Sequence, residues 1–233
     1  MIYPGVIGEF REIYAIVATT GASTGVPPLL VAYLLGLIGV FSLGHEYRHG
    51  MIRATLTAIP RREHVLVAKA VVVTVTVGVV SALSVLPAVA ITSAFGLPAP
   101  SIGAVGSLML GVTLFSMLFT LSGMGLTALT RNQTAGLVLL LLLPTVAESI
   151  LRYVVVVIRL FSDDPSAPGG LPTLLKYLPY DAGGQMYNRF SLPEADSILG
   201  GTPFGPLGGG ITLAVFVALV LAAGATRFLR RDA

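Results

Sequence analysis

The chain has 233 residues, of which 55% are hydrophobic and only 11% are charged, and its formal net charge at pH 7 is +3. Soluble globular domains carry about 25% charged residues. This composition, with a mean hydropathy of +0.88, therefore excludes a soluble enzyme, a disordered chain and a nucleic-acid-binding protein. The absence of cysteine excludes disulfides, thiolate metal sites and a cysteine nucleophile. We expect an all-α protein that crosses a membrane several times.

Five segments are long and apolar enough to cross a membrane, because about 20 apolar helical residues span roughly 30 Å of hydrocarbon. We predict one transmembrane domain over 1–233, with helices at about 27–44, 65–95, 104–130, 135–158 and 209–228. The second segment is longer than a bilayer requires, so we expect Lys69 at its wet end and a kink at Pro87. Residues 45–64 link the first two spans, and a Pro- and Gly-rich loop over 161–207 precedes the last.

The basic residues fall mostly on one side of the predicted spans. Cytoplasmic loops of membrane proteins carry an excess of Lys and Arg, so we expect this side and the C-terminus to be cytoplasmic and the 161–207 loop to lie outside. The protein would then cross a plasma membrane several times. The basic residues on the predicted cytoplasmic side are Arg48, Arg53, Arg61, Arg62, Lys69, Arg131, Arg227, Arg230 and Arg231.

A search for catalytic or metal-binding groups finds little. No phosphate-binding loop of the G-x-x-x-x-G-K-[ST] type is present, so we do not expect the chain to bind a nucleotide itself. His45 and His49 are four residues apart, the spacing of a zinc-binding pair, and His64 is nearby, but no third ligand is evident. We expect neither a metal site nor a cofactor, and no enzymatic activity.

The connection Gly44–Ala70 is the most informative stretch. Apolar Tyr47, Met51 and Ile59 are interleaved with basic and acidic residues, which predicts a short amphipathic helix or a pair of helices, broken near Gly50 and at Pro60. Two interpretations are open. The segment either lies on anionic lipid headgroups or docks into a groove of a cytoplasmic partner.

The same stretch resembles the permease subunits of type-2 ABC exporters, which work with a separate ATP-binding-cassette ATPase. The resemblance extends from Pro27 onward. Arg131–Ala135 resembles the tight turn before the fifth span of that family, Tyr177–Gly184 resembles its outer loop, and the tail from Arg227 resembles its basic end. In the first connection the matching residues are Glu46, Tyr47, Arg48, Gly50, Ile52, Arg53, Thr55, Pro60, Arg61, Arg62 and Lys69.

The resemblance implies a location in a bacterial plasma membrane, a function and a set of partners. The chain would form the translocation pathway for ATP-driven export, paired with a second permease copy or a paralogue, while the ATPase subunit binds ATP. The lining of Val, Leu, Ala and Gly favours an amphipathic or lipophilic substrate. In this view residues 45–64 hold the coupling helix that docks on the ATPase, through Glu46, Tyr47, Arg48, Gly50, Arg53, Thr55, Pro60, Arg61 and Arg62.

The chain departs from the family pattern at its start. That family has six spans and begins with a cytoplasmic elbow helix, whereas residues 1–26 match the outer loop that follows the first span. An odd number of spans also places the N-terminus outside although no signal peptide precedes it. We expect that the elbow and first span are missing from the sequence start.

Glu148 and Arg152 lie four residues apart in the fourth predicted span. A lone charge in the membrane costs a few kcal/mol, so we expect the two side chains to pair. The pair is either purely structural or lines the exit of a substrate path. Pro144, one turn earlier, can bend the helix. Within the resemblance, the following region re-enters the outer leaflet and caps the pathway.

Two other classes of protein compete with the exporter subunit. The first is a stand-alone protein, either a secondary transporter or a scaffold that binds membrane lipid. A coupled transporter should carry several ionisable residues at mid-membrane depth in matched halves, and neither feature is found. The second is an intramembrane enzyme, for which only Glu148 and Arg152 would be available as polar groups at depth.

Overall fold

A computed structural model of the protein describes residues 30–51, 62–94, 101–161, 175–187 and 204–230. Over these ranges the chain is helical and contains no strand, as predicted. Five helices are long and apolar enough to cross a membrane. In chain order the elements are α2 (Leu30–Arg48), α4 (Arg62–Ala94), α5 (Ile102–Thr130), α6 (Gln133–Leu142), the π-helical turn η1 (Leu143–Ala147), α7 (Glu148–Leu160), α9 (Pro179–Gly184) and α11 (Gly205–Arg230).

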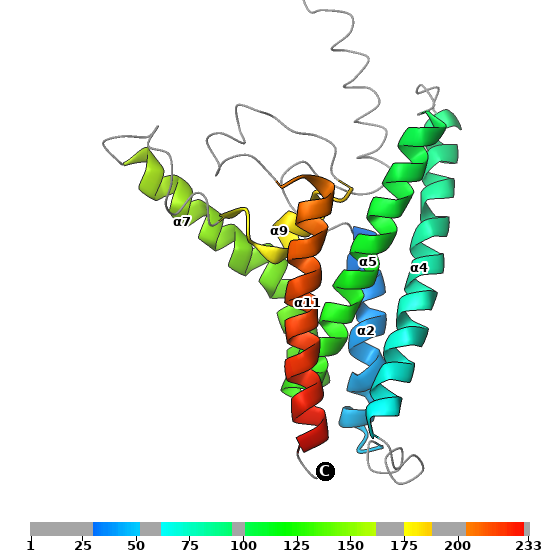
Figure 1. Ribbon diagram of the computed structural model, residues 1–233, viewed down its shortest axis with the longest axis vertical. Coiled ribbons are helices and arrows are strands. Elements are labelled where there is room, and N and C mark those ends of the chain that lie inside the picture. The colour runs from blue at the N-terminus through cyan, green and yellow to red at the C-terminus, as the bar shows by residue number, and fades with distance from the viewer. Residues whose placement is uncertain (1–29, 52–61, 95–100, 162–174, 188–203, 231–233) are drawn as a thin grey trace, which may run out of the picture.

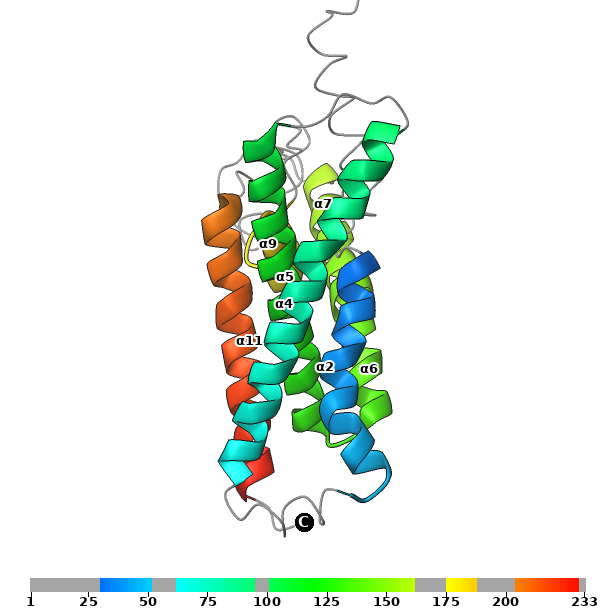
Figure 2. The ribbon, with the colours of Figure 1, turned by 90° about the vertical axis from the view of Figure 1, so that its right-hand side faces the viewer.

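Helix α5 is the centre of the bundle (Figures 1 and 2) and packs against α2, α4, α6 and α11. Its buried face carries Phe115 and Phe119, whose rings stack with centroids 5.8 Å apart. Leu140 of α6 and Leu213 of α11 join the same apolar cluster. Side chains from helices distant in sequence therefore meet on α5.

Small residues allow the helices to approach closely, as is common where membrane helices pack. A Cβ atom at Gly39 of α2 would overlap the carbonyl oxygen of Thr120 on α5. A Cβ atom at Gly209 of α11 would likewise overlap the carbonyl oxygen of Ala182 on α9. Glycine at these two positions sets the distance between backbones.

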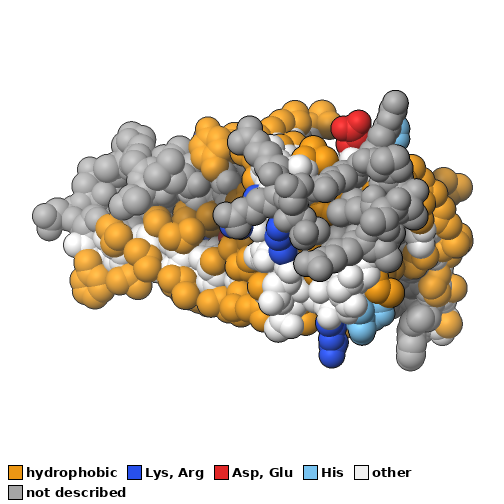
Figure 3. All heavy atoms as spheres, turned by 90° about the horizontal axis from the view of Figure 1, so that it is seen from below, with side chains coloured by type: hydrophobic (Ala, Val, Ile, Leu, Met, Phe, Trp, Pro, Cys, Tyr) orange, Lys and Arg blue, Asp and Glu red, His pale blue; other side chains and the backbone are white. Residues whose placement is uncertain are grey.

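The outward faces of the long helices are apolar. Val71, Val75 and Val79 on α4, and Ile211 and Leu219 on α11, are all more than half exposed in the isolated chain. Such a surface is stable in hydrocarbon but not in water. Figure 3, which views the bundle end-on, shows hydrophobic side chains around much of the molecule, with a few basic and histidine side chains among them. The surface supports a multi-pass membrane protein.

The ends of α2, α5 and α11 and the starts of α4 and α6 lie at the same end of the bundle, which we call the basic end (Figures 1 and 2). Here α5 turns directly into α6. Arg131 adopts a left-handed conformation (φ 54°). The Asn132 side chain then accepts hydrogen bonds from the backbone N–H groups of Thr134 and Ala135, which caps the start of α6.

The structure moves several predicted boundaries. Helix α2 continues to Arg48 rather than ending near Gly44, so Glu46 and Tyr47 lie in its last turns. The chain then turns at Gly50 (φ 67°), where a break was expected. The fourth predicted span is divided: Pro144 lies in the π-helical turn η1, and α7 beyond it leaves the bundle (Figure 1). A missing N–H at Pro144 accounts for the change in helix type.

Candidate functional site

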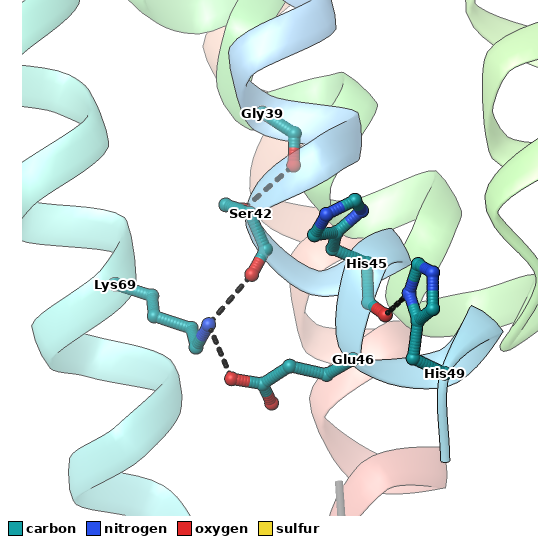
Figure 4. Close-up of polar contacts among 6 residues, drawn as sticks. All are labelled: Gly39, Ser42, His45, Glu46, His49 and Lys69. Carbon is teal, nitrogen blue, oxygen red and sulfur yellow. Dashed lines mark hydrogen bonds and ion pairs between the residues drawn. The ribbon is translucent and has the colours of Figure 1, made fainter. Parts of the chain in front are cut away.

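Two polar sites lie near opposite ends of the apolar bundle. The first, which we call the inner clamp, consists of Ser42 and Glu46 on α2 and Lys69 on α4 (Figure 4). The Lys69 ammonium donates to the carbonyl oxygen of Ser42 at 2.6 Å and forms an ion pair with Glu46 Oε1 at 2.8 Å. Its side chain is 24% exposed and that of Glu46 14%, so water competes weakly for either group. The inner clamp joins α2 to α4.

The residues of the inner clamp come from the two helices that are linked by the connection resembling a coupling helix. Glu46 lies at the start of that connection, residues 45–64, and Lys69 lies five residues beyond its end. The second carboxylate oxygen of Glu46, Oε2, and the hydroxyl of Tyr47 are buried and have no partner in the described ranges. One oxygen of the Glu46 carboxylate therefore binds Lys69, and the other has no hydrogen-bond partner in the described ranges.

The remaining predicted docking residues divide into two groups. Arg48 is exposed at the end of α2, Gly50 lies in the turn after it, and Arg62 begins α4. Arg53, Thr55, Pro60 and Arg61 lie outside the described residues.

The histidines do not assemble into a metal centre. His45 and His49 contact each other edge to face, with ring centroids 4.7 Å apart. The Nδ1 atom of His49 lies 3.0 Å from the carbonyl oxygen of His45, where a protonated nitrogen donates a hydrogen bond (Figure 4). Within the described ranges no group of three or more His, Asp or Glu residues is placed to hold a metal ion.

The second site, which we call the carboxylate cap, joins α7 to α9. Glu148 is only 6% exposed. Its Oε1 accepts a hydrogen bond from the backbone N–H of Tyr180 at 2.9 Å, and its Oε2 accepts one from Asp181 at 2.8 Å. The carboxylate thus satisfies two free N–H groups at the start of α9, where the helix dipole also favours negative charge.

Arg152, one turn along α7, forms an ion pair with the carboxylate of Asp181. The predicted direct pair between Glu148 and Arg152 is therefore wrong: each side chain binds α9 instead of the other. The reason is that α9 supplies both backbone donors and a carboxylate at the same place, so both charges are satisfied at once. Spacing along one helix could not reveal a partner 29 residues further along the chain.

Helix α9 is inserted into the core of the bundle. Tyr180 is fully buried, and its ring meets Phe119 of α5 and Phe216 of α11 edge to face at 5.6 and 5.5 Å. Its hydroxyl donates to Ser122 Oγ at 3.1 Å. The segment expected to re-enter the membrane after the fourth span thus contains at least one short helix packed inside the bundle.

Three hydroxyl groups follow the buried length of α5. Most Ser and Thr side chains in the described helices donate to a carbonyl one turn earlier, as in Ser122 and Thr127. The hydroxyls of Thr113, Ser116 and Thr120 are buried and have no partner in the described ranges. Their spacing places them on one side of the central helix. This row provides unsatisfied polar groups within an otherwise apolar core.

The partners at both sites were only partly evident from the sequence. Lys69 belongs to the quoted family motif but was not identified as the partner of Glu46, and Asp181 lies in the quoted outer-loop segment but was not identified as the partner of Arg152. Pro179 marked the start of α9, and that signal could have identified the free N–H groups that Glu148 binds. Comparisons with protein-family models, with curated proteins and with solved structures find no match to this chain.

Proposed function

We propose that this protein is the permease subunit of a bacterial ABC exporter, driven by a separate ATP-binding-cassette ATPase. The observation that carries the proposal is the inner clamp. Lys69 ties together the two helices that flank the connection with the exporter-like motif. A force applied to that connection would therefore act on α2 and α4 together.

The coupling would be thermodynamic. ATP binding closes the two ATPases of the complex, and the coupling segment of each permease moves with its ATPase. The inner clamp joins α2 to α4, the two helices between which this segment runs. The nucleotide state of the ATPase and the access state of the membrane domain would therefore bias the same two-state element. Helix α5 packs against both α2 and α4, so the movement would reach the bundle core.

The outer part of the pathway would be closed by α9. Tyr180 fills the core between α5 and α11, and the carboxylate cap holds α9 against α7. Opening to the outside would then require α9 to move. The apolar core with its row of hydroxyls on α5 suits an amphipathic or lipophilic substrate, which buries its apolar part and hydrogen-bonds through a few polar atoms.

The proposal is tested by purifying the tagged protein from its native host under gentle extraction. We expect a stoichiometric P-loop ATPase to copurify and to hydrolyse ATP faster in the complex than alone. The variant Arg53→Glu should lose the ATPase, because it reverses a charge in the docking segment. The variant Glu46→Ala should lose stimulation of ATP hydrolysis, because the inner clamp is broken. Lys176→Glu reverses a charge outside both sites and should leave both properties unchanged.

The alternative functions predict other results. A protein that emerges alone, with ATP hydrolysis at background, would favour a stand-alone transporter or a lipid-binding scaffold. Full stimulation in both Arg53→Glu and Glu46→Ala would remove the coupling mechanism.

A further inference from the structure

At the basic end, α5 and α11 are joined by two arginines that donate in opposite directions. Arg131 Nη2 donates to the carbonyl oxygen of Arg227 at 2.6 Å, and Arg227 Nη1 donates to the carbonyl oxygen of Leu129 at 2.8 Å. The two residues are 96 positions apart in the sequence. Both acceptors are carbonyls in the last turns of helices, which lack partners within the helix. We call these two residues the arginine pair.

The arginine pair carries more positive charge than its surroundings neutralise. No carboxylate forms an ion pair with either guanidinium in the described ranges, where the recorded ion pairs are Lys69–Glu46 and Arg152–Asp181. Each helix C-terminus contributes about half a negative charge. Among the described residues, two full positive charges against two such termini leave a net charge of about +1. A singly charged anion would complete the balance.

The hydrogen-bonding capacity of the pair is also incompletely used. A guanidinium has five N–H donors, and each arginine uses one of them on a helix carbonyl. Arg131 Nε is buried and has no partner in the described ranges. Tyr47 packs beside α5, against the cluster that contains Met124 and Ala128, and its buried hydroxyl is also without a partner there. Among the two arginines, it is the exposed guanidinium of Arg227 that is open to an external acceptor.

The position of the pair selects the anion. Arg227 lies one turn from the end of α11, a helix long and apolar enough to span a membrane, so its exposed guanidinium reaches headgroup level. Guanidinium forks bind phosphate oxygens by paired, charge-assisted hydrogen bonds. We propose that the arginine pair binds the phosphodiester of an anionic phospholipid at the ends of α5 and α11. This inference does not depend on the proposed export function.

The test compares lipid binding to the purified full chain in bilayer nanodiscs of phosphatidylcholine with and without phosphatidylglycerol. We expect phosphatidylglycerol to raise the thermal unfolding temperature and to remain bound in native mass spectrometry. In Arg131→Gln and in Arg227→Gln the apparent affinity should fall by about tenfold or more, because charge-assisted hydrogen bonds are lost. Arg227→Lys keeps the positive charge but not the forked guanidinium. Its lipid affinity should lie between that of the wild type and that of Arg227→Gln.

The control is Arg48→Gln, which removes an exposed arginine at the same end but outside the pair. It should leave the phosphatidylglycerol affinity unchanged. An equal loss in this control would indicate a diffuse attraction to the surface and overturn the site. The site is also overturned if both pair variants fold, by circular dichroism and gel filtration, yet keep wild-type lipid affinity. Displacement of the lipid by inorganic phosphate would assign the arginines to a soluble anion instead.

Discussion

Glu148 shows how a single carboxylate can be stable inside a largely apolar bundle. Two backbone N–H groups at the start of α9 donate to its two oxygens, and Arg152 compensates the charge of neighbouring Asp181. A buried carboxylate without such partners costs several kcal/mol. The side chain therefore stabilises the structure only as long as α9 stays in place.

We predict that Glu148→Ala lowers the free energy of unfolding in detergent by about 3 kcal/mol, because two buried N–H donors lose their acceptors. Glu148→Gln keeps one acceptor oxygen and should lose about half as much. Denaturant titration followed by circular dichroism measures both values. The control is Glu63→Ala, an exposed glutamate at the start of α4, which should change stability by less than about 0.5 kcal/mol. Equal effects at the two positions would contradict the carboxylate cap.

The sequence predicted which side chains are charged inside the bundle but not what they bind. Glu148 and Arg152 were recognised because charges are rare in apolar spans, whereas their real partners on α9 come from a separate segment of the chain. Glu46 and Lys69 were both seen in the exporter-like motif, yet pairing them requires the packing of α2 against α4. Contacts between distant segments depend on tertiary packing, which residue spacing does not encode.

At the level of elements, helix type and number were predictable and helix boundaries less so. Apolar length alone predicted five long helices, and five are present among the described residues. The end of α2 was placed too early because polar residues suggest a loop, although here Lys69 stabilises the polar last turns of the helix. Pro144 indicated a bend, and its missing N–H accounts for the π-helical turn, but a proline in a sequence does not by itself specify that helix type.

The close contact between α2 and α5 predicts opposite effects of alanine at Gly39, which lies in the contact, and at Gly106, which does not. Gly39→Ala should destabilise the protein by about 2 kcal/mol, because the added Cβ overlaps the carbonyl oxygen of Thr120 and separates the helices. Gly106→Ala, in α5 itself, meets open space and should stabilise it by about 0.5–1 kcal/mol through helix propensity. Thermal unfolding of the two variants side by side measures both shifts. Destabilisation of equal size would mean that the close approach is unimportant.

For the whole molecule, successive long helices run in opposite directions, and this determines which loops lie at the same end of the bundle. His49 and His64 are exposed at the basic end, while Gly103 and Leu207 are exposed at the starts of α5 and α11, at the opposite end. The excess of Lys and Arg in the sequence at the basic end predicts that this end faces the cytoplasm.

Because the chain contains no cysteine, single cysteines can report this orientation without background. In intact cells a membrane-impermeant maleimide should label Gly103→Cys and Leu207→Cys. It should label His49→Cys and His64→Cys only after the membrane is permeabilised. The reverse pattern would place the basic end outside and would remove the proposed docking of a cytoplasmic ATPase.

The packing of α9 against α11 also determines the order in which parts of the protein can assemble. Ala182 and Gly183 of α9 pack against Gly209 and Leu213 of α11, and α11 follows all the other described helices in the sequence. During synthesis, α9 therefore has no complete binding surface until α11 has been inserted. Until then Glu148 lacks its two backbone donors. A chain stalled before α11 would present an unsatisfied carboxylate to lipid, which costs several kcal/mol, so the insertion of α11 completes the bundle energetically as well as in sequence.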